Sequence, residues 1–306
     1  MDSVAYVTVD VFADERFAGN QLAVIPDARG LSDAQMQQIA TEFRYSEAVF
    51  VLPPEDPANT ARVRIFTPTM EIPFAGHPNV GTAFVVGGQP EIFGKAPGDL
   101  LRFEERAGLV ETALIRDASG RVAGAGILAP QPLSLGPQVD ADTVARCASI
   151  GTGDVRTANH APVIASIGLP FAVAEVAGLE ALARACPNTA AFAAAGRRFL
   201  REDEQFALFL YTRLPDRPWH FRARMFAPLD NLIEDPATGS ASGALGALLA
   251  SLQPDPELDI HIAIEQGVEM GRRSLIELHV RKSGGLVGDV RIAGRCVAVM
   301  RGSIRL

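Results

Sequence analysis

Four polar side chains of this chain stand at the edges of apolar segments, where they could transfer a proton to or from a bound small molecule. They are Glu47, His77, Asp235 and Ser240. Glu47 directly precedes the apolar residues 48–52, and a carboxylate against an apolar element loses part of its hydration. Desolvation raises the pKa of a carboxyl group toward the working pH, as a general acid/base requires. The alternative is a solvated glutamate in a loop.

The other three candidates also have ordinary structural interpretations. His77 follows a glycine near an expected helix start, where it either donates to a substrate oxygen or relays a proton, or is a packed or capping histidine. Asp235 precedes a proline, and Asp-Pro often opens a turn. Ser240 lacks a nucleophile-elbow motif, so a helix cap is the alternative for it. Together, the four residues suit proton transfer on a small carboxylic acid without a metal or cofactor.

A short phrase that occurs twice places these candidates in the chain. RIFTP at residues 64–68 leads into FAGHP at 74–78, and RMFAP at 224–228 leads into DPATGSA at 235–241. A second half that echoes the first predicts two related lobes. In each copy a glycine, Gly76 or Gly239, stands at an expected helix start. The free N–H groups and the positive dipole end of such a start suit an anion such as a carboxylate.

The first half of the chain reads as strands around one buried helix. Ser32 and Gln35 form a capping box, which predicts a helix start, and the following apolar residues recur at helical spacing. Residues 79–86 have almost no polar face, which is typical of a helix buried on all sides. β-branched and alternating segments predict strands at residues 4–12, 22–25, 48–52, 62–66 and 109–115, with turns at 17–20 and 117–120.

The second half follows the same plan. Residues 124–137, with three prolines, are the expected linker between the lobes. Helices are predicted at residues 140–149, 179–186, 189–195 and, buried, 243–249. Strands are predicted at residues 206–212, 220–226, 260–264, 275–280, 286–292 and 296–301. This order indicates an α+β fold rather than alternating βαβ units, and no dinucleotide-binding glycine motif is present.

Composition limits the classes of function. With 306 residues, two domains are the natural expectation. The formal net charge of −8 argues against nucleic acid and against anionic membranes as partners. The three cysteines, Cys147, Cys186 and Cys296, are scattered, and the histidines show no local ligand spacing. Neither a disulfide framework nor a metal site is therefore expected.

The N-terminus indicates the compartment. It begins Met1-Asp2, has no basic region and no long apolar run, so neither a signal peptide nor a membrane span is expected. The expected location is the cytoplasm.

At this point the motifs resemble those of a known family. They resemble the PhzF-like family of phenazine biosynthesis, which has the diaminopimelate epimerase fold. The matching motifs in the first half are VDVF at 9–12 with FAGN at 17–20, SEAVF at 46–50, and FTP at 66–68 with EIP at 71–73 and Gly76-His77. EDPATGSA at 234–241 and QGVEMGR at 266–272 complete the set, so the resemblance covers nearly the whole chain.

The resemblance implies a fold and an assembly. It implies two pseudo-symmetric lobes, each a bent, mostly antiparallel sheet wrapped around a central helix. The first lobe would comprise residues 1–128 and a returning last strand at about 294–306, and the second residues 129–293. The active site would lie between the lobes, and the assembly would be a homodimer without cofactor.

The resemblance also implies an activity: isomerisation of trans-2,3-dihydro-3-hydroxyanthranilate, in which a proton moves from C3 to C1 of the ring. Glu47 matches the glutamate that carries this proton, and His77, Asp235 and Ser240 match residues that hold the substrate and assist the transfer. Gly76 and Gly239 match the backbone donors for the substrate carboxylate. Asn20 and Ser46, within the matched motifs, are also expected to bind substrate.

Some positions depart from the family pattern. Ala75 and Pro78 flank Gly76-His77 where Cys and Ala are frequent, and Gln21 follows Asn20 where Pro is common. No cysteine stands at either helix start, which excludes a two-thiol racemase mechanism. Two alternatives stay open: an epimerase of an amino or hydroxy acid that uses one carboxylate, and a non-catalytic protein that binds a small carboxylate.

Overall fold

A computed structural model describes residues 3–201, 205–230 and 232–306 of the chain. Met1 and Asp2, on which the expectation of no signal peptide partly rests, lie outside the described residues. The chain divides into two units, Met1–Leu128 with Ala293–Leu306, and Ala129–Ile292. No helix among the described residues is both long enough and apolar enough to cross a membrane.

The first unit consists of strands around one central helix. Its strands are β1 (Ser3–Val11), β2 (Asn20–Ile25), β3 (Glu47–Leu52), β4 (Ala61–Phe66), β5 (Glu71–Ile72), β6 (Leu100–Glu105), β7 (Gly108–Arg116), β8 (Val122–Leu128) and the last part of β18 (Leu286–Arg305). Its helices are α1 (Asp33–Phe43) and α2 (Gly76–Gly87). Strand pairing runs from β18 through β1, β2, β3, β4, β6, β7 and β8 and back to β18, so the sheet closes on itself.

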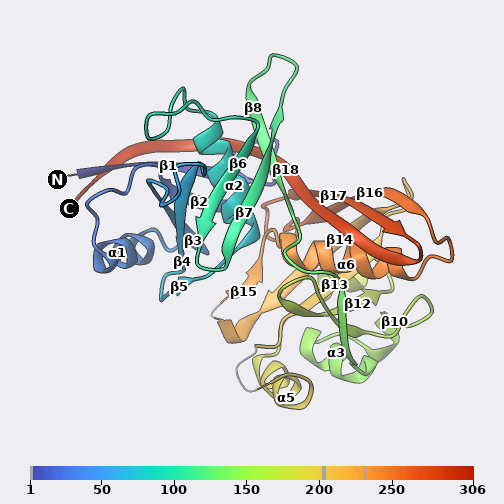
Figure 1. The fold of residues 1–306 in the computed structure, drawn as a ribbon. Coiled ribbons are helices and arrows are strands. Elements are labelled where there is room, and N and C mark those ends of the chain that lie inside the picture. The colour runs from blue at the N-terminus through green and yellow to red at the C-terminus, as the bar shows by residue number, and fades with distance from the viewer. Residues whose placement is uncertain (1–2, 202–204, 231) are drawn as a thin grey trace. The chain divides into compact units, whose positions relative to one another are not determined.

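Helix α2 occupies the middle of this closed sheet (Figure 1). It contacts β1, β2, β3, β7 and β8, and nine of its twelve residues are buried. Gly81 lets the strands approach, because a Cβ there would lie 2.6 Å from Leu22 and 2.7 Å from Val11. The apolar, all-round burial predicted for this helix is therefore confirmed.

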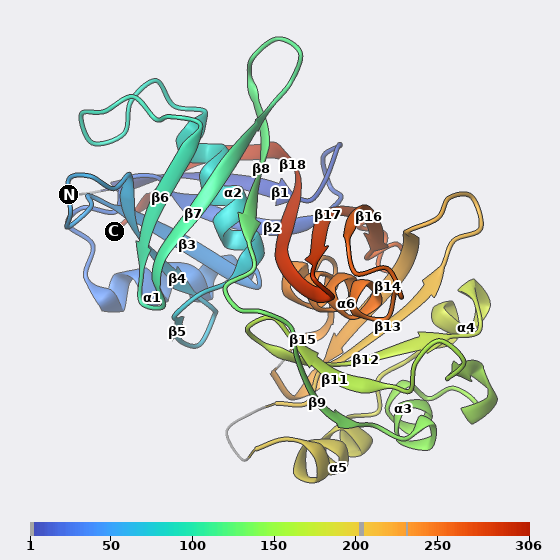
Figure 2. The same cartoon turned by 45° about the vertical axis from the view of Figure 1, so that its right-hand side comes forward.

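The second unit repeats the plan. Its strands are β9 (Ser134–Gln138), β10 (Val155–Arg156), β11 (Val163–Ser166), β12 (Pro170–Val176), β13 (Leu208–Arg213), β14 (His220–Ala227), β15 (Leu232–Asp235), β16 (Leu258–Gln266) and β17 (Ser274–Ser283). Its helices are α3 (Ala141–Ala148), α4 (Leu179–Arg184), α5 (Thr189–Phe199) and α6 (Gly239–Ser251), with single turns η1 (Thr152–Asp154) and η2 (Pro228–Asp230). Helix α6 is buried against β11, β12, β16 and β17 (Figure 2).

The strand pairings of the two units match. In the first, β4 is antiparallel to β3 and β5 and parallel to β6, and α2 makes the crossover from β4 to β6. In the second, β14 is antiparallel to β13 and β15 and parallel to β16, and α6 makes the crossover. A parallel pair requires such a crossover, usually a helix. The expected α+β fold with two pseudo-symmetric lobes is thus confirmed.

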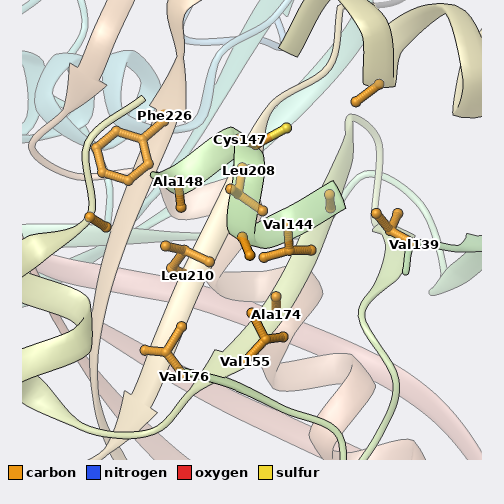
Figure 3. Packing of buried hydrophobic residues seen from close by; sticks show 14 of the residues in the cluster. Val139, Val144, Cys147, Ala148, Val155, Ala174, Val176, Leu208, Leu210 and Phe226 are labelled. Atoms are coloured by element: carbon orange, nitrogen blue, oxygen red, sulfur yellow. The ribbon is translucent and has the colours of Figure 1, made fainter. Parts of the chain in front are cut away.

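Outer helices cover a further apolar layer in each unit. The capping box of α1 is present, since Ser32 accepts from the Gln35 amide and Gln35 accepts from the Ser32 amide. Helix α1 buries Met36 and Ile39 against the sheet. In the second unit, α3 buries Val144 and Cys147 against β12 and β13 (Figure 3). Phe192 of α5 belongs to the same cluster.

Two expectations about the elements were wrong, and several strands were not predicted. Residues 124–137 are not a linker throughout, because 124–128 belong to β8 and 134–138 form β9. Gly124 does not break β8; it lets Gly294 approach, and a Cβ there would lie 2.1 Å from the Gly294 carbonyl oxygen. The two last strands are one continuous strand, β18, because Gly294 interrupts the apolar pattern but not the backbone. The sequence patterns also do not predict the strands β5, β6, β8, β9, β10, β11, β12 and β15.

The repeated R-x-F-x-P phrase builds the same contact in each unit. Arg64 on β4 donates to both Glu71 oxygens of β5 at 2.8 Å, and Arg224 on β14 donates to both Glu234 oxygens of β15 at 2.7 and 2.8 Å. Each guanidinium also lies over the phenylalanine two positions later, 5.2 Å from the ring of Phe66 and 4.8 Å from that of Phe226. These two Arg–Glu pairs fix the turns that lead into α2 and α6.

The remaining guanidinium nitrogen of each arginine, Nη1, joins the Arg–Glu pair to an outer helix by hydrogen bonds. Arg64 Nη1 donates to Asp33 in the first turn of α1 at 2.5 Å. Arg224 Nη1 donates to the carbonyls of Leu182 and Ala185 at 2.9 and 2.8 Å, where α4 ends. Terminal carbonyls of a helix need such donors.

We expect Arg224→Met to lower the free energy of unfolding by roughly 3 kcal/mol, because it leaves the partly buried Glu234 carboxylate without its cation. Arg64→Met is the matched control, and it should cost less because the Arg64 side chain is twice as exposed, 18% against 9%. The double variant Arg224→Met/Glu234→Gln should recover part of the loss. Urea unfolding of the four proteins checks this, and an unchanged midpoint for Arg224→Met would contradict it.

Candidate active site

Glu47 and His77 come together in the first unit. Glu47 is the first residue of β3, directly after the segment that follows α1, and its side chain is 16% exposed. His77 is the second residue of α2 and is 7% exposed. The His77 Nε2 atom lies 3.2 Å from the Glu47 Oε2 atom. The alternative of a solvated loop glutamate is therefore wrong.

Asn20 completes this group, which we call the Glu47 cluster (Asn20, Glu47, His77). Asn20 begins β2, is 2% exposed, and its Nδ2 atom lies 3.5 Å from His77 Nδ1. In this contact the role of Nδ1 is set by which ring nitrogen carries the proton.

The turn before Asn20 is fixed by the matched motifs. Asp10 accepts from the Phe17 amide at 2.6 Å. Gly19 has φ +64°, and a Cβ there would lie 2.3 Å from the Val11 carbonyl oxygen. A side chain at position 19 would therefore push Asn20 away from His77.

Burial controls the charge of His77. It lowers the pKa of His77 from the ordinary 6.5 to about 3, and a hydrogen bond with the Gln21 backbone offsets part of that fall. His77 is therefore a neutral imidazole at physiological pH. It is packed, and it does not cap α2, because the residue at the cap position is Ala75.

In the second unit, Asp235 is the centre of a second group, the Asp235 cluster (Asp235, Thr238, Gln266). Asp235 ends β15, is 6% exposed, and accepts from the Thr238 hydroxyl at 2.6 Å. Gln266, at the end of β16, donates to the Asp235 carbonyl oxygen at 2.8 Å and to the Thr238 hydroxyl at 3.0 Å. Its amide oxygen accepts from the Thr238 backbone at 3.1 Å.

The turn of the Asp235 cluster is packed as tightly as the one before Asn20. Gly267 has φ +71°, and a Cβ there would lie 2.6 Å from the Pro236 carbonyl oxygen. The Ser274 hydroxyl donates to that same oxygen at 2.7 Å. The QGVEMGR motif therefore holds the turn that precedes α6.

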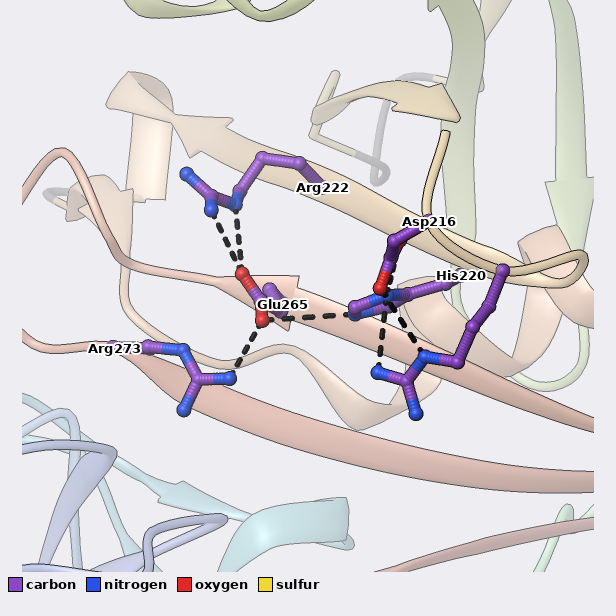
Figure 4. Close-up of polar contacts among 6 residues, drawn as sticks. Asp216, His220, Arg222, Glu265 and Arg273 are labelled. Carbon is purple, nitrogen blue, oxygen red and sulfur yellow. Dashed lines mark hydrogen bonds and ion pairs between the residues drawn. The ribbon is translucent and has the colours of Figure 1, made fainter. Parts of the chain in front are cut away.

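A charged network surrounds Glu265, the residue before Gln266 in the chain (Figure 4). Glu265 is 8% exposed and accepts from Arg222 at 2.7 Å and from Arg273 at 2.6 Å. His220 lies next to it, with Nε2 3.6 Å from the carboxylate. The two arginines lower the pKa of Glu265 against the opposing effect of burial. The end of β16 is thereby held in place.

The two central helices begin without a side-chain cap. The residues at the cap positions, Ala75 and Thr238, make no capping hydrogen bond with their side chains. In α6 the first intrahelical donor is Ser242, which leaves the amides of Gly239, Ser240 and Ala241 outside the helical pattern. Ser240 is thus the second residue of α6, so its interpretation as the helix cap is wrong.

The start of α2 offers fewer donors. Asn79 is its first intrahelical donor, and Pro78 has no N–H, so only Gly76 and His77 present amides. Gly76 is not required by packing, since an added Cβ would meet only Ile127 Cδ1 at 3.7 Å. Ser46, beside Glu47, is half-buried.

Sequence reasoning missed several residues around these groups. Gln266 was matched only as part of a motif, and its three hydrogen bonds join positions far apart in the chain. Glu105 was not noticed either: burial raises its pKa to about 8, and Asn79 in the first turn of α2 offsets part of the rise. Glu105 also lines a pocket of about 700 Å³ with Arg62, Arg64 and Glu71, and neither Glu47 nor His77 lines it.

Comparison with known proteins agrees with the fold. The chain is 24% identical to a PhzF-family phenazine biosynthesis protein from Bacillus anthracis, whose crystal structure superposes with a TM-score of 0.86 over all of both chains. The chain therefore has the fold of this PhzF-family structure.

The sequence comparisons identify the family. The model of the phenazine biosynthesis-like proteins, PhzC-PhzF, matches residues 9–302. An uncharacterized isomerase of Mesorhizobium japonicum is 36% identical over 99% of both chains. Trans-2,3-dihydro-3-hydroxyanthranilate isomerase of Pseudomonas aeruginosa is 35% identical over 97% of this chain and 98% of its own length. The chain belongs to the PhzC-PhzF family, and it is an enzyme of the isomerase class.

We expect the free energy of unfolding to fall as the pH is lowered from about 6.5 toward 3. In that window the unfolded chain binds a proton at His77 and the folded chain does not, because the folded pKa is about 3. The loss from this group is at most about 1.4 kcal/mol per pH unit. His77→Gln should remove this pH dependence. The difference in free energy of unfolding between wild type and His77→Gln should therefore become smaller as the pH is lowered from 7.5 to 5.

Urea unfolding of wild type, His77→Gln and the control His160→Gln at both pH values measures the effect. A His77→Gln variant that loses as much stability on acidification as wild type would show that His77 binds its proton equally well in both states.

Proposed function

We propose that this isomerase moves a proton on a small unsaturated carboxylic acid, with Glu47 as the general acid/base and without a metal or cofactor. The observation that carries the proposal is the largely buried Glu47 carboxylate, 3.2 Å from the neutral imidazole of His77 at the start of α2. The named activity of the Pseudomonas aeruginosa relative supports a substrate similar to trans-2,3-dihydro-3-hydroxyanthranilate.

The proposed step is a proton shuttle. The Glu47 carboxylate takes a proton from carbon, the C–H bond breaks, and its electron pair moves into the conjugated system of the substrate. The carboxylic acid thus formed then gives the proton to another carbon, and the carboxylate is restored. By the family resemblance the two carbons are C3 and C1 of the ring. Nothing is oxidised or reduced, so the step needs no electron donor or acceptor besides the substrate and Glu47.

His77 orients Glu47 in this proposal. The His77 Nε2 atom lies 3.2 Å from Glu47 Oε2, and Asn20 Nδ2 lies 3.5 Å from Nδ1, so the ring is packed between the amide and the carboxylate. With a pKa of about 3, His77 does not compete with Glu47 for the substrate proton near neutral pH.

The two helix starts bind the substrate carboxylate and its neighbouring polar groups. The amides of Gly76 and Gly239 are the proposed donors, because the helix dipoles favour an anion there. Asp235 and Ser240 hold polar groups of the substrate, and Ser46 contributes beside Glu47. By the family resemblance, these residues of the two units act on one substrate.

The assembly and location are part of the proposal. A homodimer is what the family resemblance implies. The three cysteines are all unpaired, which agrees with a reducing compartment such as the cytoplasm.

We expect Glu47→Gln to bind ligand and keep its fold but to lose turnover by about 10²–10⁴-fold, because the amide cannot accept the proton. The assay follows loss of the C3 hydrogen of trans-2,3-dihydro-3-hydroxyanthranilate by NMR in D₂O. Glu42→Gln, an exposed carboxylate on α1, is the matched control.

Each outcome of this assay separates the candidate functions. Normal turnover by Glu47→Gln would refute the catalytic assignment. Deuterium uptake with inversion at one carbon would favour the epimerase alternative, and ligand binding without any exchange would favour the non-catalytic one. If this substrate is not converted, small unsaturated and amino carboxylic acids are screened for deuterium uptake.

We expect Gly76→Ala to raise KM by roughly 10- to 100-fold with a smaller effect on kcat. The added methyl group has room in the protein but occupies the approach to the first amides of α2, which costs a charge-assisted hydrogen bond of about 1.5–3 kcal/mol. Gly98→Ala, whose Cβ would also be unhindered, is the control. Steady-state kinetics measures the effect, and an unchanged KM would place the substrate carboxylate elsewhere.

A further inference from the structure

The hairpin of β16 and β17 presents two imidazoles and a carboxylate on one face. The antiparallel register places His261 directly opposite His279, and Asp259 lies two positions before His261 on the same strand. Neighbouring Ile262 and Leu278 face α6, where they lie within reach of a Cβ at Gly246. Because side chains alternate along a strand, Asp259 and His261 point to the opposite face.

The three side chains are already close to a chelating arrangement. The two imidazole rings are stacked, with centroids 4.5 Å apart and planes within 6°. His279 Nε2 lies 2.6 Å from Asp259 Oδ1. One donor atom from each of the three residues lies within 4.8 Å of the other two. Asp259 and His261 are exposed and His279 is half-buried, so water and ions reach the group.

We propose that Asp259, His261 and His279 bind one divalent transition-metal ion of the zinc type. Imidazole and carboxylate are good ligands for zinc, nickel and copper, whereas magnesium and calcium prefer oxygen alone. With metal–donor distances of about 2.0–2.2 Å, donors in a tetrahedral site lie about 3.4 Å apart. Rotation of exposed side chains closes the remaining distance, and water fills the fourth position.

Two existing contacts compete with the metal. The ion displaces the proton that His279 shares with Asp259, and Arg281 donates to the other oxygen of Asp259 at 3.2 Å. Arg281 stands directly opposite Asp259 in the register, so its charge also opposes a cation. Removing Arg281 should therefore tighten metal binding.

Ligand spacing along the sequence does not reveal this group. His261 and His279 are neighbours only because β16 and β17 pair, and local spacings such as H-x-x-x-H describe ligands within one helix. The absence of such spacing therefore excludes a helical site but not a cross-strand one.

Isothermal titration with zinc chloride tests the proposal on the full chain. All proteins carry Cys186→Ser, which removes the exposed thiol. We expect one ion per chain, and His261→Ala or His279→Ala should weaken the affinity at least roughly tenfold, since even an outer-shell partner of a metal ligand is worth that much. Arg281→Gln should bind more tightly. Glu277→Gln on the same strand and His160→Gln elsewhere are the matched controls and should bind like wild type.

A second measurement does not depend on variants. Paramagnetic Ni²⁺ should broaden the imidazole NMR signals of His261 and His279 before those of the other histidines. The proposal is overturned if wild type binds no zinc, if the double variant His261→Ala/His279→Ala keeps the affinity, or if Ni²⁺ broadens other histidines first. Circular dichroism of each variant shows that a loss of binding is not a loss of fold.

Discussion

The Arg–Glu pairs Arg64–Glu71 and Arg224–Glu234 are the contacts on which the rest of each unit depends. Each joins a central strand to the short strand after it, and the third arginine nitrogen joins both to an outer helix. The chain must turn there before it enters the central helix. A guanidinium fork satisfies both carboxylate oxygens with fixed geometry, so it sets where α2 and α6 begin. The pairs therefore also fix the positions of the residues at those helix starts.

Burial of the central helices is the second constraint, and it explains the chemistry at their starts. The first amides of any helix lack a partner within the helix. The chain supplies no side-chain cap at Ala75 or Thr238, and the amides after them stay outside the helical pattern. The same burial keeps His77 neutral beside Glu47. Burial of the helices therefore accounts both for the proposed anion donors and for the neutral state of His77 beside the proposed base, Glu47.

The two units differ in how they hold the turn before the helix. In the first, the backbone of Gly19 and the Asp10 carboxylate set the position of Asn20. In the second, Gln266 at the end of β16 and Ser274 at the start of β17 donate hydrogen bonds to carbonyl oxygens of the turn after Asp235. Family membership follows from the sequence comparisons, whereas the fold alone does not identify the substrate.

The sequence by itself determined the repeat, the α+β class, the two buried helices and the family, because these rest on apolar periodicity and on motifs that are contiguous in the chain. It also identified Glu47 and His77 as candidates. Only the tertiary structure decided that these two meet, that Gln266 holds Asp235, that β18 is continuous, and that His261 faces His279. Those contacts join residues far apart in sequence, and strand pairing and burial, which create them, are properties of the folded chain alone.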